Sequence, residues 1–254
     1  MNANPLFELQ QAIYSSKNYT RRRLHQSRFA WVIEAIKNHS SRASKTRAIE
    51  YGPGSGIYLP RLAEAFDEVL GADVEPAYLS GIEQLAINND AISLVVDDIQ
   101  ASKFEEGTFG LVLCSEVLEH VPNPEIALKT IARILRPGGI AIITTPQKYS
   151  LIELSCKVAF LPGIIQLVRL IYREPILETG HISLRSYGDF TAAISACGLK
   201  IIVHKKLGLY VPLIAEFGGE AGGRFIERLE DRLKNSRLSW MLWTQAYVLR
   251  KSDE

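Results

Sequence analysis

The sequence has little cysteine, no long uninterrupted apolar run and almost no net charge, and each shortage excludes a class of protein. Three cysteines in 254 residues, none in a C-x-x-C pair, indicate neither a disulfide framework nor a metal–thiolate site. A formal net charge of +1 points to no particular partner. The most apolar stretch, residues 151–172, is broken by three charged residues and a Pro-Gly pair, so it is a poor membrane span. We therefore expect a cytoplasmic protein without a signal peptide.

Short, almost continuous apolar runs alternate with helical patterns from residue 48 onward. The apolar runs predict strands over residues 48–51, 68–73, 92–96, 109–114, 140–145, 199–205 and 240–250. The helical patterns cover residues 5–14, 22–38, 57–66, 75–88, 123–135, 187–197 and 225–235. Strands that are apolar along their whole length are typical of a sheet covered on both faces. The order of elements predicts an α/β fold with a doubly wound, parallel sheet.

Composition divides the chain into four parts. Residues 1–47 form a predicted helical cap with nine Lys and Arg but only two Glu, and residues 48–146 form the regular core. Residues 147–181 form an apolar helical insertion or lid, and residues 182–254 add the C-terminal part of the same sheet. The basic cap has two readings, a solvated helix face or a surface for phosphates, anionic lipid or nucleic acid.

A glycine-rich loop joins the first predicted core strand to the helix that follows. Gly52, Gly54 and Gly56 stand within five residues, and Glu50 stands two positions before the first of them. Such a turn lets a ligand approach the backbone at a helix N-terminus. The spacing departs from the dinucleotide pattern G-x-G-x-x-G, because Ile57 stands where the third glycine belongs. A phosphate-binding P-loop is excluded too, since its lysine is missing.

The pattern E-x-G-x-G-x-G resembles motif I of the class I S-adenosylmethionine-dependent methyltransferases. The segments "VLGADVEP", "VVDDI", "FGLVLCSEVLEHVPNP" and "ILRPGGIAIITTP" agree with that family in order and spacing. The resemblance implies a Rossmann-like sheet of seven strands, mostly parallel with an antiparallel last strand, with helices on both faces. It also implies S-adenosylmethionine as the cofactor. The cofactor-binding residues that it implies are Glu50, Gly52, Gly54, Gly56, Asp73, Val74, Asp98, Ile99 and Cys114.

The candidate catalytic groups follow the fourth core strand. Glu116, Glu119 and His120 are spaced at i, i+3 and i+4, so a helical turn would place them on one face. Carboxylates and an imidazole together suit a divalent cation. The arrangement E-x-x-E-H resembles the ubiquinone-biosynthesis O-methyltransferases and the plant small-RNA 2′-O-methyltransferases. The latter implies that His181 completes a magnesium site.

Two other readings of this segment stay open. His120 is then a general base without a metal, or the whole segment only caps the sheet. In each catalytic reading His120 is the first candidate for catalysis, and the lack of an [N/D]-P-P-[Y/F] motif favours an oxygen acceptor.

The insertion at residues 147–181 stands where this fold commonly covers its acceptor site. Its two apolar stripes predict a helical pair packed on the core, or a lid for a lipophilic acceptor that also contacts a membrane surface from the cytoplasmic side. The alternatives are a soluble small molecule or RNA as acceptor, or a non-catalytic cofactor-binding partner subunit. No separate RNA-binding module is recognisable, so we do not expect nucleic acid as a partner.

Overall fold

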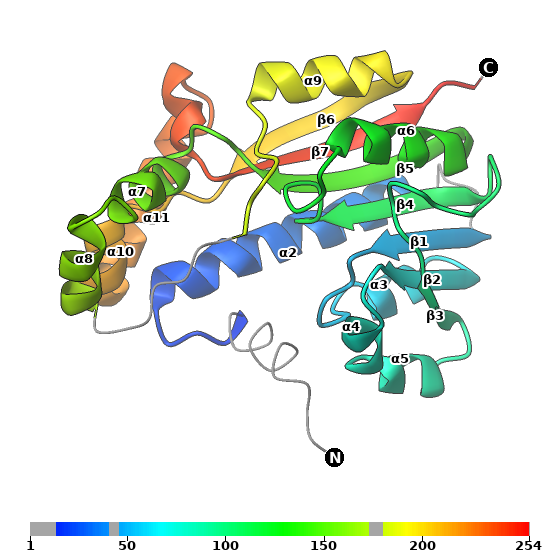
Figure 1. Cartoon of the computed structure of the whole chain (residues 1–254), viewed down its shortest axis with the longest axis horizontal. Coiled ribbons are helices and arrows are strands. Elements are labelled where there is room, and N and C mark those ends of the chain that lie inside the picture. Colours follow the sequence, from blue (N-terminus) through cyan, green and yellow to red (C-terminus); the bar gives the residue numbers. More distant parts are fainter. Residues whose placement is uncertain (1–13, 41–45, 173–179, 254) are drawn as a thin grey trace.

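A single seven-stranded sheet organises the protein, and the computed structural model describes residues 14–40, 46–172 and 180–253 of it (Figure 1). The order of strands across the sheet is β3-β2-β1-β4-β5-β7-β6. The strands are β1 (Arg47–Tyr51), β2 (Glu68–Asp73), β3 (Ile92–Val96), β4 (Phe109–Ser115), β5 (Leu135–Pro146), β6 (Leu199–Leu207) and β7 (Thr244–Lys251). Strands β1 to β5 pair in parallel, and β7 pairs antiparallel with both β5 and β6. The predicted doubly wound sheet with an antiparallel last strand is therefore confirmed.

Helices cover both faces of this sheet. They are α2 (Tyr19–His39), α3 (Leu59–Ala63), α4 (Pro76–Ser80), α5 (Glu83–Ile87), α6 (Pro124–Ile134), α7 (Leu151–Ala159), α8 (Ile164–Tyr172), α9 (Tyr187–Ala196), α10 (Pro212–Phe217) and α11 (Gly219–Leu233). One core cluster joins α6 and α9 to the sheet, and a second joins α2 and α3 to it (Figure 1). Helix α2 is thus an integral layer of the fold.

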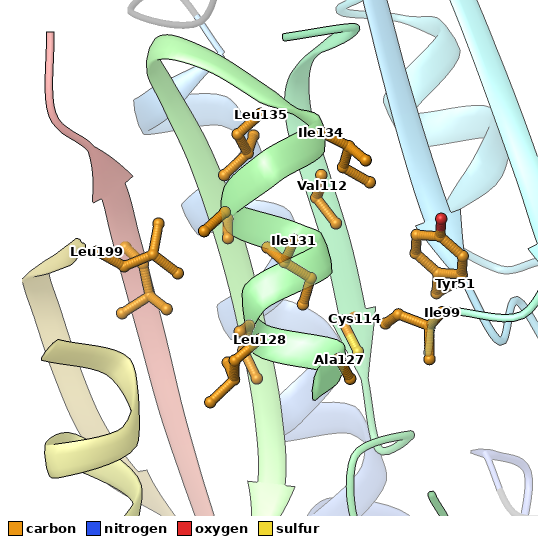
Figure 2. Packing of buried hydrophobic residues seen from close by; sticks show 14 of the residues in the cluster. Tyr51, Ile99, Val112, Cys114, Ala127, Leu128, Ile131, Ile134, Leu135 and Leu199 are labelled. Carbon is orange, nitrogen blue, oxygen red and sulfur yellow. The ribbon is translucent and has the colours of Figure 1, made fainter. Parts of the chain in front are cut away.

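Strand β4 shows why the apolar runs predicted these strands. Successive side chains of a strand point to opposite faces, so a strand covered on both faces needs apolar residues at every position. Leu111 and Leu113 belong to the cluster under α2, whereas Val112 and Cys114 belong to the cluster under α6. Figure 2 shows Val112 and Cys114 beside Ala127 and Ile131 of α6. All four β4 side chains are completely buried.

Several predicted elements differ from the structure in their bounds: the helix expected over residues 57–66 is only Leu59–Ala63, and the strand expected from residue 140 begins at Leu135. The helix expected over residues 75–88 is two short helices, α4 and α5. Glycine has a low helix propensity, which disfavours a continuous helix at Gly81. The next residue, Ile82, departs from helical backbone angles and is only 2% exposed. The strand expected from residue 240 begins at Thr244, after a 3₁₀ helix η1 (Arg237–Met241). The helix expected over residues 5–14 lies almost wholly outside the described residues.

The apolar insertion is helical, and it packs beside the C-terminal helices. Leu151 of α7 contacts a small core cluster formed by Leu209, Ala215, Ile226, Leu233 and Leu242. In Figure 1, α7, α8, α10 and α11 gather at one end of the molecule. None of the helices within residues 14–40, 46–172 and 180–253 combines the length and the apolar character needed to cross a bilayer.

Candidate active site

Two adjoining cavities lie at the carboxyl ends of the central strands, where α/β sheets of this kind bind ligands. They have volumes of about 240 and 290 Å³, and both are lined by Gly52 and His120. The first is also lined by Tyr14, His25, Arg28, Glu50, Pro53, Gly54, Ser55, Ile57, Tyr58, Ser115 and Glu116. The second is also lined by Tyr51, Ala72, Asp73, Val74, Asp97, Asp98, Ile99, Gln100, Val117, Val121 and Pro122. Together they form one cleft. The first cavity carries both basic and acidic side chains, whereas the second carries acidic ones.

The glycine loop forms the floor between the two cavities. Gly52 has a φ of +64°, which disfavours any side chain, and its N–H donates to the Ala72 carbonyl oxygen at 2.8 Å. A Cβ atom at this position would lie 2.5 Å from Cγ2 of Val117. The loop therefore needs glycine both for its backbone shape and for the close packing of the segment after β4.

Glu50 ends in the first cavity and is 2% exposed. Its Oε2 atom is buried and has no hydrogen-bond partner. Burial raises the pKa of Glu50 well above its ordinary value. A buried, unpaired carboxyl oxygen beside a glycine turn is suited to a ligand that brings N–H donors or a positive charge.

Acidic side chains mark the second cavity. Asp73 ends β2, its Oδ1 accepts from the backbone N–H of Glu75 at 2.9 Å, and burial raises its pKa. Asp98 follows β3, and its Oδ1 accepts from the backbone N–H of Gln100 at 2.8 Å. The neighbouring Asp97 also lines this cavity, but it is buried, and its two oxygens accept hydrogen bonds from the Tyr51 hydroxyl at 2.9 Å and the Lys103 N–H at 3.1 Å. Asp73 and Asp98 are thus the carboxyl groups that a ligand would meet here.

The other implied cofactor residues lie in three different settings. Gly54 lines the first cavity, and Val74 and Ile99 line the second, with Val74 65% exposed. Gly56 lines neither cavity; a Cβ there would approach Leu85 to 2.4 Å. The Cys114 side chain lies in the core under α6, where burial raises the pKa of its thiol (Figure 2). The structure does not place this thiol in the cleft.

The segment after β4 forms a turn where a helical face was expected. Glu116 has a φ of +58°, which is unusual for a residue with a side chain and marks a functional or strained position. Residues 118–120 form a turn and no helix, and the Oε2 atom of Glu116 pairs with Nη1 of Arg28 on α2 at 2.8 Å. The prediction that Glu116, Glu119 and His120 share one helical face was therefore wrong.

Three of the four candidate catalytic residues do converge. The carboxyl oxygens of Glu119 and ring nitrogens of His120 and His181 offer ligand atoms within 4.8 Å of one another. The two imidazole ring centres are 5.2 Å apart. Glu119 is 1% exposed; Thr145 donates to its Oε2 at 3.0 Å, and its buried Oε1 has no hydrogen-bond partner. An orphaned carboxyl oxygen beside two imidazoles is a donor set that fits a divalent cation.

Burial shifts the pKa values of Glu119 and His120 in opposite directions. Burial, and then the charge of Glu116, raise the pKa of Glu119 well above its ordinary value. Burial lowers the pKa of His120, whose Nδ1 lies 3.2 Å from the Gly180 carbonyl oxygen. A neutral imidazole at the junction of both cavities can accept a proton or bind a metal.

Arg28 and His25 are cleft residues that were not predicted from the sequence. Burial opposes the charge of Arg28, but Glu116, with Tyr14 and Tyr58, more than offsets this and raises its pKa. A signal was present, because Arg28 falls on the apolar face of α2 that also carries Leu24, Trp31, Val32, Ala35 and Ile36. A charged residue on such a face indicates a buried partner.

The lowered pKa of His25 should make the stability of the protein depend on pH. Burial and then the Arg28 charge lower its pKa from 6.5 to about 3. The unfolded chain therefore binds more protons between these values, and the free energy of unfolding falls as pH falls through that window. By about pH 5 the loss from His25 reaches up to about 2 kcal/mol. His25→Gln should remove this loss when urea unfolding is compared at about pH 7 and about pH 5. An equal fall in both proteins would contradict the assignment.

Known proteins resemble this chain most clearly in the segment that contains the glycine loop, Asp73, Asp98 and His120. Residues 49–143 match the family model described as "Methyltransferase domain". The ubiquinone biosynthesis O-methyltransferase of Rickettsia typhi is 31% identical over 146 residues, which are 56% of this chain and 55% of that protein. The protein of that name in Burkholderia multivorans is 33% identical over 125 residues, 48% of this chain and 51% of that protein. The chain thus aligns with about half the length of the curated relatives it matches.

Solved structures show the same fold over most of the chain. An S-adenosylmethionine-dependent methyltransferase from Mesorhizobium loti has a TM-score of 0.59 and 15% identity, covering 86% of this chain and 96% of that one. A geranyl diphosphate methyltransferase in complex with GPP and sinefungin has a TM-score of 0.56 and 13% identity, covering 87% of this chain and 78% of that one. Residues 49–143 therefore resemble a methyltransferase domain, and the solved structures show the same fold over most of the chain.

Proposed function

We propose that this protein transfers the methyl group of S-adenosylmethionine to an oxygen atom of a small acceptor, and that the acceptor is lipophilic or linked to a lipid. The observation that carries the proposal is the cluster of Glu119, His120 and His181 beside a cleft that fits the cofactor. Bound S-adenosylmethionine supplies an electrophilic methyl group, and the protein must align an acceptor oxygen with it.

The cleft offers groups of the right charge for each part of this cofactor. The amino-acid end of the cofactor carries an ammonium and a carboxylate, and the first cavity contains the Glu50 carboxyl group and the Arg28 guanidinium. The ribose hydroxyls and the adenine amino group are donors, and the second cavity contains Asp73 and Asp98 as acceptors. Gly52 keeps the floor between the two cavities free of a side chain.

The catalytic cluster serves the acceptor in one of two ways. Glu119, His120 and His181 would hold a divalent cation, which lowers the pKa of a bound hydroxyl group. Two imidazoles and one carboxylate accept manganese, iron or zinc as readily as magnesium, so the identity of the metal is open to test. Without a metal, His120 takes the acceptor proton itself as a general base. The unpartnered Oε1 of Glu119 favours the metal.

The insertion supports an apolar acceptor. Val158 and Leu161 are 55% and 49% exposed at the α7–α8 corner, and Tyr149 is 50% exposed just before α7. Apolar side chains exposed beside an active site suit an apolar substrate or peripheral contact with a membrane surface. The relatives named ubiquinone biosynthesis O-methyltransferase point to the same chemical class. A soluble acceptor or RNA is the alternative, and the intact catalytic cluster argues against a non-catalytic partner subunit.

The test is transfer of a labelled methyl group from S-adenosylmethionine into an extract of the source cells, followed by partition into organic and aqueous phases. We expect label in the organic phase, and we expect EDTA to abolish it if a metal is used. Label found only in the aqueous phase would overturn the lipophilic acceptor. Activity that persists in EDTA would leave His120 as a base without a metal, and no transfer at all would overturn the function.

Asp73→Ala should weaken binding of S-adenosylmethionine at least about tenfold, because hydrogen bonds to an ionised acceptor are among the stronger polar contacts. Isothermal titration calorimetry would measure the affinity. Asp90→Ala is the matched control, since Asp90 is exposed and lines neither cavity. Equal affinities in Asp73→Ala and the control would remove Asp73 from the cofactor site.

A further inference from the structure

Glu153 is the most deeply buried side chain of the insertion helix α7. It is 4% exposed, and the other eight residues of this nine-residue helix are all more exposed. An amphipathic helix normally buries its apolar side chains first. The exception indicates that Glu153 has a specific partner inside the protein.

Two side chains from distant parts of the chain meet Glu153. The indole Nε1–H of Trp243 donates to its Oε1 at 3.1 Å. The Nδ1 atom of His181 lies 3.1 Å from the same oxygen, and 9% of the His181 side chain is exposed. Glu153 therefore joins α7, the segment at His181 and the chain just before β7.

The contact with Glu153 determines which nitrogen of His181 faces the catalytic cluster. A carboxylate oxygen only accepts hydrogen bonds, so Nδ1 of His181 carries the proton and donates. In the tautomer with this proton, the lone pair is on Nε2, on the other side of the imidazole. A carboxylate that orients an imidazole in this way fixes its tautomer and makes it a better metal ligand.

Trp243 connects the same contact to the cofactor half of the cleft. Its ring lies 6.0 Å from the ring of His25, and the guanidinium of Arg28 lies 5.9 Å from its centre. Both of these α2 residues line the first cavity. One continuous series of contacts thus runs from Arg28 through Trp243 and Glu153 to His181.

We propose that Glu153 is a positioning residue, which holds His181 with Nε2 presented to the cluster and so makes assembly of the acceptor site depend on docking of the insertion helix. The inference rests on the catalytic cluster proposed above. It assigns a role to Glu153 and Trp243, neither of which touches the reacting groups. Loss of Glu153 should act on the metal affinity and on the tautomer of His181, while cofactor binding is kept.

The experiment compares the unaltered protein with Glu153→Gln, Trp243→Phe and Glu125→Gln. Mn²⁺ is titrated in the presence of S-adenosylhomocysteine and followed by calorimetry. Glu125→Gln is the matched control, because Glu125 pairs with Arg185 in the same region but contacts neither histidine. We expect Glu153→Gln to lose about tenfold or more in Mn²⁺ affinity, and Trp243→Phe to lose less. The control should bind like the unaltered protein.

A second readout does not depend on any metal. Nitrogen-15 spectra of the imidazoles in metal-free protein, in mildly alkaline buffer, report which ring nitrogen is protonated. We expect His181 to be protonated at Nδ1 in the unaltered protein, and Glu153→Gln to populate the other tautomer. A merely structural role for Glu153 would lower the thermal stability and leave the tautomer unchanged.

The outcomes separate the two proposals. If the unaltered protein binds no Mn²⁺ but His181 shows the expected tautomer and its change, the metal is refuted and the positioning role stands. If Mn²⁺ binds equally well to Glu153→Gln, or if His181 is protonated at Nε2 in the unaltered protein, the positioning role is overturned.

Discussion

Replacing His120 with alanine should slow methyl transfer by about 10²–10⁴-fold, which is the usual contribution of a positioned acid–base group. His120 lies at the junction of both cavities, and its nitrogen Nε2 lies 3.9 Å from Oε1 of Glu119. The change removes a metal ligand or a base, and either loss acts on turnover. Binding of S-adenosylmethionine should stay close to that of the unaltered protein, because the acidic residues of the cleft are unchanged. Steady-state rates and calorimetry measure the two quantities separately.

His39→Ala is the control for this result. His39 lies in the last turn of α2 and lines neither cavity, so its loss should leave turnover unchanged. The proposal would fail if His120→Ala kept full turnover. A fall in cofactor affinity as large as the fall in rate would instead make His120 a cofactor-binding residue.

Arg28→Met should lower the free energy of unfolding by about 3–5 kcal/mol, as expected when one partner of a buried ion pair is removed. The Arg28 side chain is 9% exposed and that of Glu116 is 17% exposed. Methionine fills most of the space of arginine but leaves the Glu116 carboxylate without its partner. Urea unfolding at neutral pH measures the change.

A double-mutant cycle gives the control. Glu116→Gln removes the carboxylate, so Arg28→Met combined with Glu116→Gln should be more stable than Arg28→Met alone. If the double variant is as unstable as the sum of the two single changes, the ion pair is not the source of the loss. Cofactor affinity should fall in both variants that lack Arg28, because this guanidinium lines the first cavity.

Local patterns in the sequence were sufficient for most of the sheet and for the acidic residues of the second cavity. Strands β2, β3 and β4 each contain a short apolar run, and two acids at or after the ends of such runs, Asp73 and Asp98, line the second cavity. Parallel strands bring their carboxyl ends to one edge of the sheet, so a residue that ends a strand is placed by the topology alone. The prediction of one helix over residues 75–88 was wrong, because the helix is interrupted at Gly81 and Ile82 is buried there.

The surroundings of Glu116 and His181 were harder to predict, because their contacts connect segments that are far apart in the sequence. Arg28 meets Glu116 across 88 positions of sequence, and Glu153 meets Trp243 across 90. The turn that separates Glu116 from Glu119 needs a positive φ at a glutamate, which no helical pattern reveals. A charged residue among the apolar positions of α2, at Arg28, was the available signal of one such partner.

The position of β7 in the sheet has a consequence for synthesis of the chain. This strand fills the gap between β5 and β6, although it is made after both of them. On the ribosome, β5 therefore keeps an open edge while about one hundred further residues are added, and an unpaired apolar edge is prone to wrong pairing. The native pairing of β5 can therefore be completed only after residues 244–251 have emerged.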